Sequence, residues 1–429
     1  MIAVWMLGLF VALMLLRVPV DIAVGVGVLA GVLIVGHPLD VIPRQMVGSV
    51  DSFILLAVPL FRLAGNLMNA GGVTSKIFAF SRAVFGWMRG GLAQVNVVAS
   101  MIFAGMSGAA IADLAGLGVV EMKAMRENGY SPRMSIAITL ASCTIGPIIP
   151  PSIVLVVYGL ATEVSIGRLF LAGIVPGLVI ALFLMVFVNV YARLYPEEFG
   201  RLEPFVPSEV WRTFRSAFLD LLTPPIIVIL LLTGTSTPTE VGVFACVYAV
   251  FLGLVNRELS IRKLKNCLVS TLGTTAIIMY LIAISTVLGE ITVHEGVAQR
   301  AAEFVGGITS NRLLALLAIN VFLLFVGMLL DSLPALVIAS TVLFPVVREL
   351  GVDPVHFGVI ICFNLIIGII TPPMGIGLYV ASRVGEMPVE AVFKAVWPFF
   401  LPLLFSLLVI VAVPELSTWL PDLVFGKAR

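Results

Sequence analysis

Two apolar segments, each interrupted by glycine and proline, constrain this chain more than any other feature. The first reads ASCTIGPIIPPS (residues 141–152) and the second FNLIIGIITPPMG (residues 363–375). Hydrocarbon cannot satisfy the backbone amides and carbonyls that such a break frees, so breaks at membrane depth survive only where protein or a water-filled cavity supplies partners. Each break is therefore a candidate binding site within a membrane protein.

Composition supports the membrane assignment. Of the 429 residues, 60% are hydrophobic and 11% are charged, and the mean hydropathy is +1.15, whereas soluble domains contain about 25% charged residues. A spanning helix needs roughly 20 apolar residues, so the apolar runs leave room for about ten spans and some shorter re-entrant pieces. The net charge of +1 excludes the basic footprint of a nucleic-acid-binding protein. We expect an all-α polytopic membrane protein.

The N-terminal apolar run is expected to be retained as a span, because its first basic residue, Arg17, follows the run and an A-x-A-like cleavage site is lacking. The cysteines have no CxxC spacing and lie in apolar surroundings, which predicts inert core thiols. The histidines are scattered, which argues against a histidine metal site. The cysteines are Cys143, Cys246, Cys267 and Cys362, and the histidines are His37, His294 and His356.

The two breaks belong to an internal duplication. Positions 103–151 match positions 325–373 at 15 of 49 places without a gap, where roughly 4 or 5 matches are expected by chance from average composition. The matches include the glycines of the two breaks (368 − 146 = 222) and RENGYSP against RELGVDP. Similarity at one fixed offset over this length indicates two related halves.

The duplication predicts the domain organisation. We expect a first inverted repeat over residues 1–200, a cytoplasmic linker over residues 201–216 and a second inverted repeat over residues 217–429. Each repeat is expected to contain a re-entrant helical hairpin, at about 94–122 and about 311–347, followed by a broken transmembrane helix, at about 134–162 and about 355–384.

The charges of two connectors predict that the hairpins enter the membrane from opposite faces. The connector after the first hairpin, residues 122–133, carries three basic residues and one acid, whereas its counterpart, residues 344–355, carries one basic residue and two acids. Positive residues favour the cytoplasmic side. Inverted repeats whose broken helices meet at the midplane are the architecture of many secondary transporters.

A broken helix can bind both an ion and an anionic substrate. The first half-helix ends in unpaired carbonyls that can coordinate Na⁺, and the second begins with free amides that favour a carboxylate. Hydroxyl, amide and carboxylate oxygens near these ends suit a hard cation. The predicted Na⁺ ligands are Ser107, Ser142, Thr144, Gly146, Asp331, Ser332, Asn364, Gly368 and Thr371, at two or more sites. The predicted substrate contacts are Ser107, Gly108, Pro151, Ser152, Thr371 and Pro373.

These predictions compete with plainer interpretations. Hydroxyl groups in membrane helices often bond only to their own helix or to a neighbour, although two aligned breaks make a simple kink less favoured. Asp331 is the stronger acid candidate, because an acid at membrane depth is costly and usually functional. Asp113 maps onto Ala335, so both a ligand role and a structural hydrogen bond stay open. Arg62 and Arg383 are interpreted as topological or snorkelling charges rather than substrate clamps.

Several longer motifs carry a family resemblance that covers essentially the whole chain. They are GNLMNAGG (65–72), RGGLAQVNVVASMIFAGMSGAAIAD (89–113), NGYSP (128–132), SCTIGPIIPPS (142–152) and SIGRLFLAGIVPG (165–177). With them the chain resembles the large membrane subunit of TRAP transporters, of the DctM/SiaM type. It departs from the family at Ala109, where a second serine is frequent, and around residues 121–123, where a proline is common.

The resemblance implies a function and a set of partners. It implies an elevator-type transport domain that carries both hairpins, a scaffold domain, and Na⁺-driven uptake of an organic acid across the bacterial inner membrane, without an organic cofactor. It also implies a periplasmic substrate-binding protein and a small four-helix membrane subunit, expected here as a separate chain, with lipid around the complex.

Three other functional classes share some of these features. A stand-alone divalent-anion/Na⁺ symporter of similar architecture is the main alternative. An intramembrane enzyme is less favoured, because the sequence contains no HExxH motif and no serine with a histidine or lysine that the repeat would bring together. A passive channel is less favoured because paired hairpins and broken helices suit a carrier that occludes its substrate.

Overall fold

The computed structural model describes residues 20–36, 38–233, 235–296, 311–373 and 375–427, and also residues 8, 9, 12, 13, 16 and 18. The side chains of residues 20, 21, 35 and 292–294 are not described. The predicted N-terminal span before residue 20, His37 and the His294 side chain therefore lie outside the described residues. Within the described part, all regular structure is helical, as the composition predicted.

The helices of the first half follow the predicted order. They are α2 (Val20–Val35), α3 (Val41–Val50), η1 (Phe53–Leu56), α4 (Ala57–Ala70), α5 (Val73–Phe85), α6 (Gly91–Ser107), α7 (Ala110–Ala115), α8 (Leu117–Glu127), α9 (Pro132–Ser142), η2 (Cys143–Ile145), α10 (Ile153–Thr162) and α11 (Ile166–Leu194).

The second half continues with η3 (Pro196–Glu198), α12 (Pro207–Leu221), α13 (Thr223–Leu232), α14 (Pro238–Val255), α15 (Ile261–His294), α17 (Arg312–Leu329), α18 (Ser332–Glu349), α19 (Pro354–Ile369), α20 (Ile376–Gly385), α21 (Val389–Val396), η4 (Trp397–Phe399), α22 (Phe400–Ala412) and α23 (Glu415–Phe425).

Seven of the described helices are long and apolar enough to cross a membrane, or eight if α12 and α13, bent by 40°, form one span. Shorter apolar helices, among them α6, α10 and α19, fall below the roughly 20 residues that a span needs. The sequence alone left room for about ten spans. The count covers the described residues only, so it leaves out the predicted N-terminal span, and the two breaks shorten the helices on either side of them.

The first hairpin consists of α6, α7 and α8, and the second of α17 and α18. The two differ in the returning arm, which breaks at Gly116 in the first hairpin and is continuous in the second. At the first tip, Gly108 has a φ of +61°, a left-handed conformation that favours glycine. A Cβ added at Gly108 would lie 2.2 Å from the Pro151 carbonyl oxygen, so the tip touches the first break.

Both broken helices begin with the same local device, which follows from the repeated sequence. Gly129 and Gly351 turn the chain with φ of +87° and +70°. Ser131 then caps α9 by accepting a hydrogen bond from the amide of residue 134, and Asp353 caps α19 by accepting from those of residues 355 and 356. A proline occupies the first turn in each case, where its missing amide needs no partner.

The two broken helices run in opposite directions. Tyr158 on α10 donates a 2.8 Å hydrogen bond to the carbonyl of Pro354, which starts α19. Arg126, at the end of the first hairpin, donates a 2.6 Å hydrogen bond to the carbonyl of Gly385, which ends α20. Each broken helix therefore runs from the mouth of its own hairpin toward the mouth of the other, which is the relationship expected of inverted repeats.

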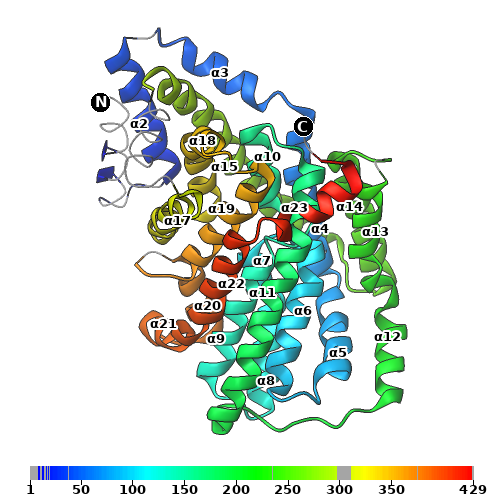
Figure 1. Cartoon of the computed structure of the whole chain (residues 1–429). Helices are drawn as coiled ribbons and strands as arrows, with labels where there is room; N and C mark the ends of the chain where they lie inside the picture. Colours follow the sequence, from blue (N-terminus) through cyan, green and yellow to red (C-terminus); the bar gives the residue numbers. More distant parts are fainter. Residues whose placement is uncertain are drawn as a thin grey trace.

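The repeats also interlock. Within each repeat, the first half-helix packs on its own hairpin, α9 on α6 and α8, and α19 on α17 and α18. Beyond the break, α10 packs on α18 of the second hairpin and α20 packs on α7 of the first. The hairpins and broken helices consequently form one packed body, which occupies the middle of the view in Figure 1.

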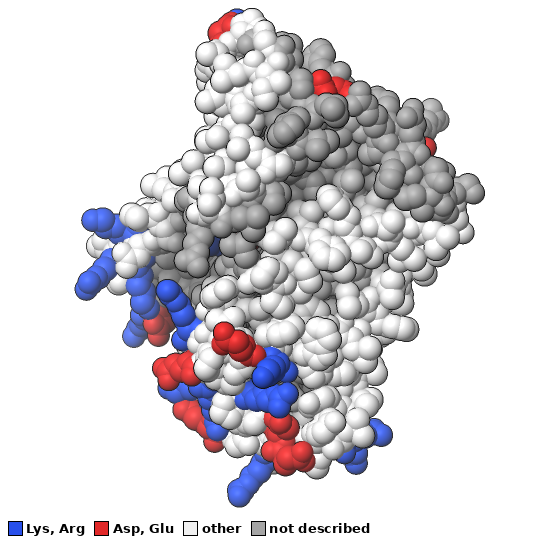
Figure 2. Space-filling view, turned by 90° about the vertical axis from the view of Figure 1, so that its left-hand side faces the viewer, with Lys and Arg blue, Asp and Glu red and all other residues white. Residues whose placement is uncertain are grey.

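Charged side chains gather toward one end of the molecule, and much of the rest of the face in Figure 2 carries none. The end that holds α8 and the start of α12 lies opposite α3 in Figure 1, and we call it the basic end after Arg89, Lys123 and Arg133. The predicted linker, residues 201–216, includes most of helix α12. Arg82 anchors it by donating hydrogen bonds of 2.8 and 2.9 Å from Nε to Glu203, which raise the pKa of the guanidinium.

Candidate ion and substrate site

The tip of the first hairpin is enclosed by the first break on one side and by α4 on the other. A Cβ added at Gly65 on α4 would lie 3.0 Å from the Cα of Ser107, so the helix backbone approaches the tip closely. Ser107 itself is 3% exposed. The predicted contacts Ser107, Gly108 and Pro151 are therefore neighbours in the structure.

Asp113 is the acid at this tip. It is 2% exposed, and its Oδ1 accepts a hydrogen bond from the hydroxyl of Ser107. Its Oδ2 has no hydrogen-bond partner among the described residues and lies where a side chain of Gly146 would be, 2.4 Å from an added Cβ. A buried carboxylate oxygen without a donor is costly unless a cation or proton meets it. The arrangement makes the first break a candidate cation site.

The hydroxyl groups of the first break are mostly engaged. Ser142 donates a 2.5 Å hydrogen bond to Asn96 Oδ1 and accepts one of 3.1 Å from Ser100. Thr144 donates to the carbonyl three residues before it, and Ser152 donates to the carbonyl of Pro147 while capping α10. Their protons are therefore used inside the protein, whereas a hydroxyl oxygen can still offer a lone pair to a cation.

The second break offers a parallel set of oxygens. Asp331 caps α18, with its Oδ1 accepting a 2.7 Å hydrogen bond from the amide of Ser332. Asn364 is fully buried and donates hydrogen bonds of 2.9 and 2.7 Å to the carbonyl and the Oδ1 of Asn320, while its own Oδ1 meets no donor in the described part of the chain. The pair matches Asn96 and Ser142 of the first repeat (320 − 96 = 224, 364 − 142 = 222).

Backbone contact brings the second hairpin and its break together. A Cβ added at Gly327 would lie 3.1 Å from the Cα of Gly368, and one added at Gly368 would lie 2.5 Å from the backbone of Gly327. Thr371 donates a 2.8 Å hydrogen bond to the carbonyl of Ile367, and Pro373 follows in the interval before α20. Glycine at both positions permits this approach, because any side chain would separate the two segments.

Arg62 relates the two hairpins electrostatically. It lies on α4, is half-buried, and interacts electrostatically with Asp113 of the first hairpin and Asp331 of the second. Its Nε is buried and finds no hydrogen-bond acceptor within the described ranges. Sequence reasoning interpreted Arg62 as a topological charge, because nothing local indicates which acids α4 will meet. Arg383, interpreted in the same way, is exposed at the end of α20.

Comparison with known proteins gives the family. Residues 7–416 match the model of the tripartite ATP-independent periplasmic transporter, DctM component. The sialic acid TRAP transporter large permease protein SiaM of Vibrio cholerae is 42% identical over 387 residues, which cover 90% of each chain. The C4-dicarboxylate TRAP transporter large permease protein DctM of Rhodobacter capsulatus is 33% identical over 432 residues, which cover 97% of this chain and 98% of the relative. This chain belongs to the DctM family.

Two further similarities bear on the DctM chain. The isethionate TRAP transporter permease protein DctMQ of Oleidesulfovibrio alaskensis is 37% identical over 415 residues, 95% of this chain but only 65% of the relative, which is therefore longer. The crystal structure of the Alcanivorax borkumensis YdaH transporter superposes with a TM-score of 0.61 over 89% of this chain and 90% of that one. At 17% identity the YdaH likeness concerns the fold alone.

Sequence reasoning on this DctM chain missed a second buried acid in the first hairpin. Glu121 on α8 is 1% exposed, and its Oε1 has no hydrogen-bond partner among the residues described. The charged group that influences it is Asp113, eight residues before it. The signal was present in the sequence, because Glu121 is an acid next to the apolar run of the first hairpin.

Proposed function

We propose that this chain is the permease of a TRAP transporter that takes up an organic acid together with Na⁺. The single observation that carries the proposal is the free, buried Oδ2 of Asp113 at the first break. A cation stabilises an ionised carboxylate in that position, and oxygen ligands suit a hard cation. The oxygens near Asp113 come from hydroxyl groups and backbone carbonyls, which are ligands that a hard cation such as Na⁺ accepts.

The proposed Na⁺ sites use the two breaks. At the first, Asp113 joins Ser107, Ser142, Thr144 and the carbonyls around Gly146. At the second, the ligands are drawn from Asp331, Ser332, Asn364, Gly368 and Thr371. Asn364 supports the second site most directly, because its buried Oδ1 accepts no hydrogen bond in the described part of the chain.

The charges explain how Na⁺ can promote binding of a carboxylate. Asp113 and Asp331 together with Arg62 leave one net negative charge around the hairpin tips, which repels an anion. Two Na⁺ ions reverse the sign and leave one net positive charge. Arg62 can then bind the carboxylate with its unused Nε. The backbone amides that follow Pro151 and Pro373 supply further donors. Gly108 and Ser152 lie beside the amides that follow Pro151.

The packing supports an elevator mechanism. The interlocked hairpins and broken helices form one body, which can move as a transport domain. Helices α14 and α15 each pack on α4, and these three helices are the proposed scaffold. α4 also contacts α6 through Gly65, so Arg62 lies at the boundary between the two bodies, where an ion- or substrate-dependent contact can control movement.

The partners and location follow from the relatives. We propose that a separate small membrane subunit braces the scaffold and that a periplasmic binding protein delivers the acid, with sialic acid and C4-dicarboxylates as the first candidates. The longer DctMQ relative is consistent with a second membrane component. The excess of basic residues at the basic end favours the cytoplasmic side for that end of the chain, in the inner membrane of a bacterium.

Reconstitution tests the proposal. The chain is placed in proteoliposomes with its small subunit and binding protein, and uptake of labelled sialic acid and succinate is measured with a Na⁺ gradient or with K⁺ in its place. We expect uptake of one acid that requires both Na⁺ and the binding protein. Uptake by this chain alone would instead identify a stand-alone symporter, and uptake that is equal in K⁺ would refute Na⁺ coupling.

A further inference from the structure

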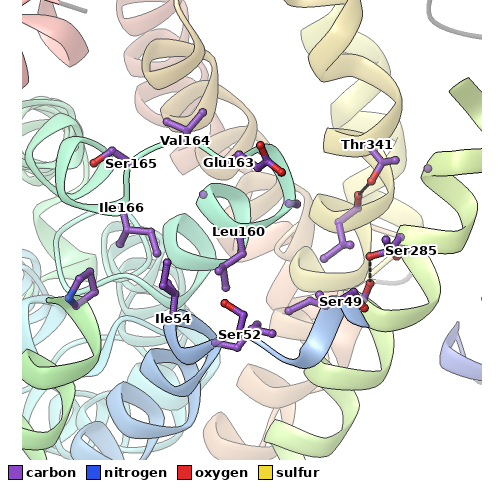
Figure 3. Close-up of a pocket in the computed structure, with 18 of the residues that line it drawn as sticks. Ser49, Ser52, Ile54, Leu160, Glu163, Val164, Ser165, Ile166, Ser285 and Thr341 are labelled. Atoms are coloured by element: carbon purple, nitrogen blue, oxygen red, sulfur yellow. Dashed lines mark hydrogen bonds between the residues drawn. The ribbon is translucent and has the colours of Figure 1, made fainter. Parts of the chain in front are cut away.

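A large cavity lies away from the hairpin tips. Its volume is about 770 Å³, which is within the range of about 300–1,000 Å³ found for small-molecule sites. It is lined by α3 and η1, by the connection from α10 to α11, and by α15 and α18. Figure 3 shows residues from these elements around a common space, with Ser49 near Ser285 and with Ser52 and Thr341 further apart.

The lining of the cavity is rich in neutral hydroxyl groups. One charged side chain, Glu163, lines it, and no lysine, arginine or histidine does so among the described residues. Ser285 is 2% exposed, and its hydroxyl group has no hydrogen-bond partner within the described ranges. The hydroxyl-bearing residues are Ser49, Ser52, Ser165, Ser285, Thr286 and Thr341.

The position of the cavity suits a receiving site. It lies at the end of the molecule where α3 is found, opposite the basic end (Figure 1). It is formed on one side by the proposed scaffold helix α15 and on the other by α18 and the end of α10, which belong to the interlocked body. Movement between these two bodies would therefore change the cavity directly.

We propose that this cavity is an outer binding site for a polyhydroxylated monocarboxylic acid, and that it holds the hydroxyl-bearing chain before the carboxylate reaches the hairpins. The inference rests on the proposed function and names the class of acid that is carried. Serine and threonine hydroxyls both donate and accept, so they match the hydroxyls of a sugar acid. A buried ionised group needs a charged partner, and among the described residues the one charged side chain that lines the cavity, Glu163, is negative.

The same features disfavour a small dicarboxylate. A four-carbon diacid has two charges, few or no hydroxyl groups and a volume that would leave most of the cavity to water. Both of its carboxylates would lie near Glu163 without a cation in the described lining. The difference between the two classes is therefore large enough to be measured by direct binding, without transport.

The test measures binding by the purified full-length chain, as the rise in its unfolding temperature with ligand concentration in K⁺ buffer. The probes are sialic acid and gluconate, with succinate for comparison. We expect stabilisation by a hydroxylated acid, and a dissociation constant weakened about 3- to 10-fold by Ser285→Ala and by Thr341→Val, since each removes one hydrogen bond. Ser285→Leu, which fills part of the cavity, should abolish this binding.

The matched control is Ser340→Ala, because Ser340 is buried beside Thr341 on the same helix, bonds to the carbonyl of Val337 and does not line the cavity. Its ligand affinity should equal that of the unaltered chain. Stabilisation by succinate alone, or equal effects of all four substitutions, would overturn the inference. Because no Na⁺ is present, these outcomes are independent of Na⁺-coupled uptake, whose failure would refute the proposed function separately.

Discussion

Asp113→Asn is the substitution that examines the proposed Na⁺ site most directly. The change keeps the shape of the side chain and its hydrogen bond with Ser107, while it removes the charge from the buried carboxylate that faces Gly146. A site that depends on this charge must lose affinity for Na⁺, whereas a carboxylate with a purely structural role would leave the affinity unchanged.

The magnitude follows from the electrostatics of a partly buried site. Two unit charges 4 Å apart interact by about 4 kcal/mol at an effective dielectric constant of about 20. Part of this is offset, because the empty site no longer contains a buried, unpaired carboxylate. We therefore expect a loss of about 2 to 4 kcal/mol, which corresponds to a weakening of about 30-fold to about 1,000-fold.

The assay is a Na⁺ titration of the thermal stability of the purified chain, with K⁺ added to hold ionic strength constant. Asp353→Asn is the matched control, because Asp353 only caps α19 and asparagine caps helices nearly as well. The control should keep the Na⁺ midpoint of the unaltered chain. A midpoint for Asp113→Asn within about twofold of the control, equivalent to less than about 0.5 kcal/mol, would refute the assignment of Asp113 as a ligand.

The remaining predictions concern the hairpins. Ser107→Ala and Asp331→Ala should each weaken the Na⁺ dependence of uptake in a protein that stays folded, and an unchanged Na⁺ response in both would remove them from the site. Gly108→Ala should lower stability by more than Gly351→Ala, measured by thermal unfolding, because both incur the roughly 1–2 kcal/mol of a left-handed residue but only the first meets backbone, at 2.2 Å.

Most of the frame was predictable because its signals are local and repeated. The first hairpin was expected at about 94–122 and extends from Gly91 to Glu127, and the second broken helix was expected at about 355–384 and extends from Pro354 to Gly385. Glycine and proline determine where helices end through backbone geometry alone. The offset of 222 then placed the same boundaries twice, so each copy supported the other.

The contacts of the site were less predictable because they join elements that are distant in sequence. The sequence left Asp113 open between a ligand role and a structural hydrogen bond, because it has no acidic counterpart at position 335. Its bond with Ser107 depends on the tight turn at Gly108. The role of Arg62 depends on how α4 packs against both hairpins, which no pattern within α4 indicates.

Residues that follow the duplication and residues that depart from it contribute differently to the candidate site. Residues that obey the repeat, such as the pairs Asn96 with Ser142 and Asn320 with Asn364, join each hairpin to its own broken helix. The two acids do not obey it: Asp331 stands at its hairpin tip, whereas Asp113 stands six residues beyond Ser107 and returns to it through a hydrogen bond. Arg62 is also unmatched, because its equivalent in the second repeat is Thr286 (286 − 62 = 224), and this single cation interacts with both acids. We infer that the repeated residues build the moving body and supply matched oxygen ligands at the two breaks, whereas Asp113, Asp331 and Arg62 supply its charges.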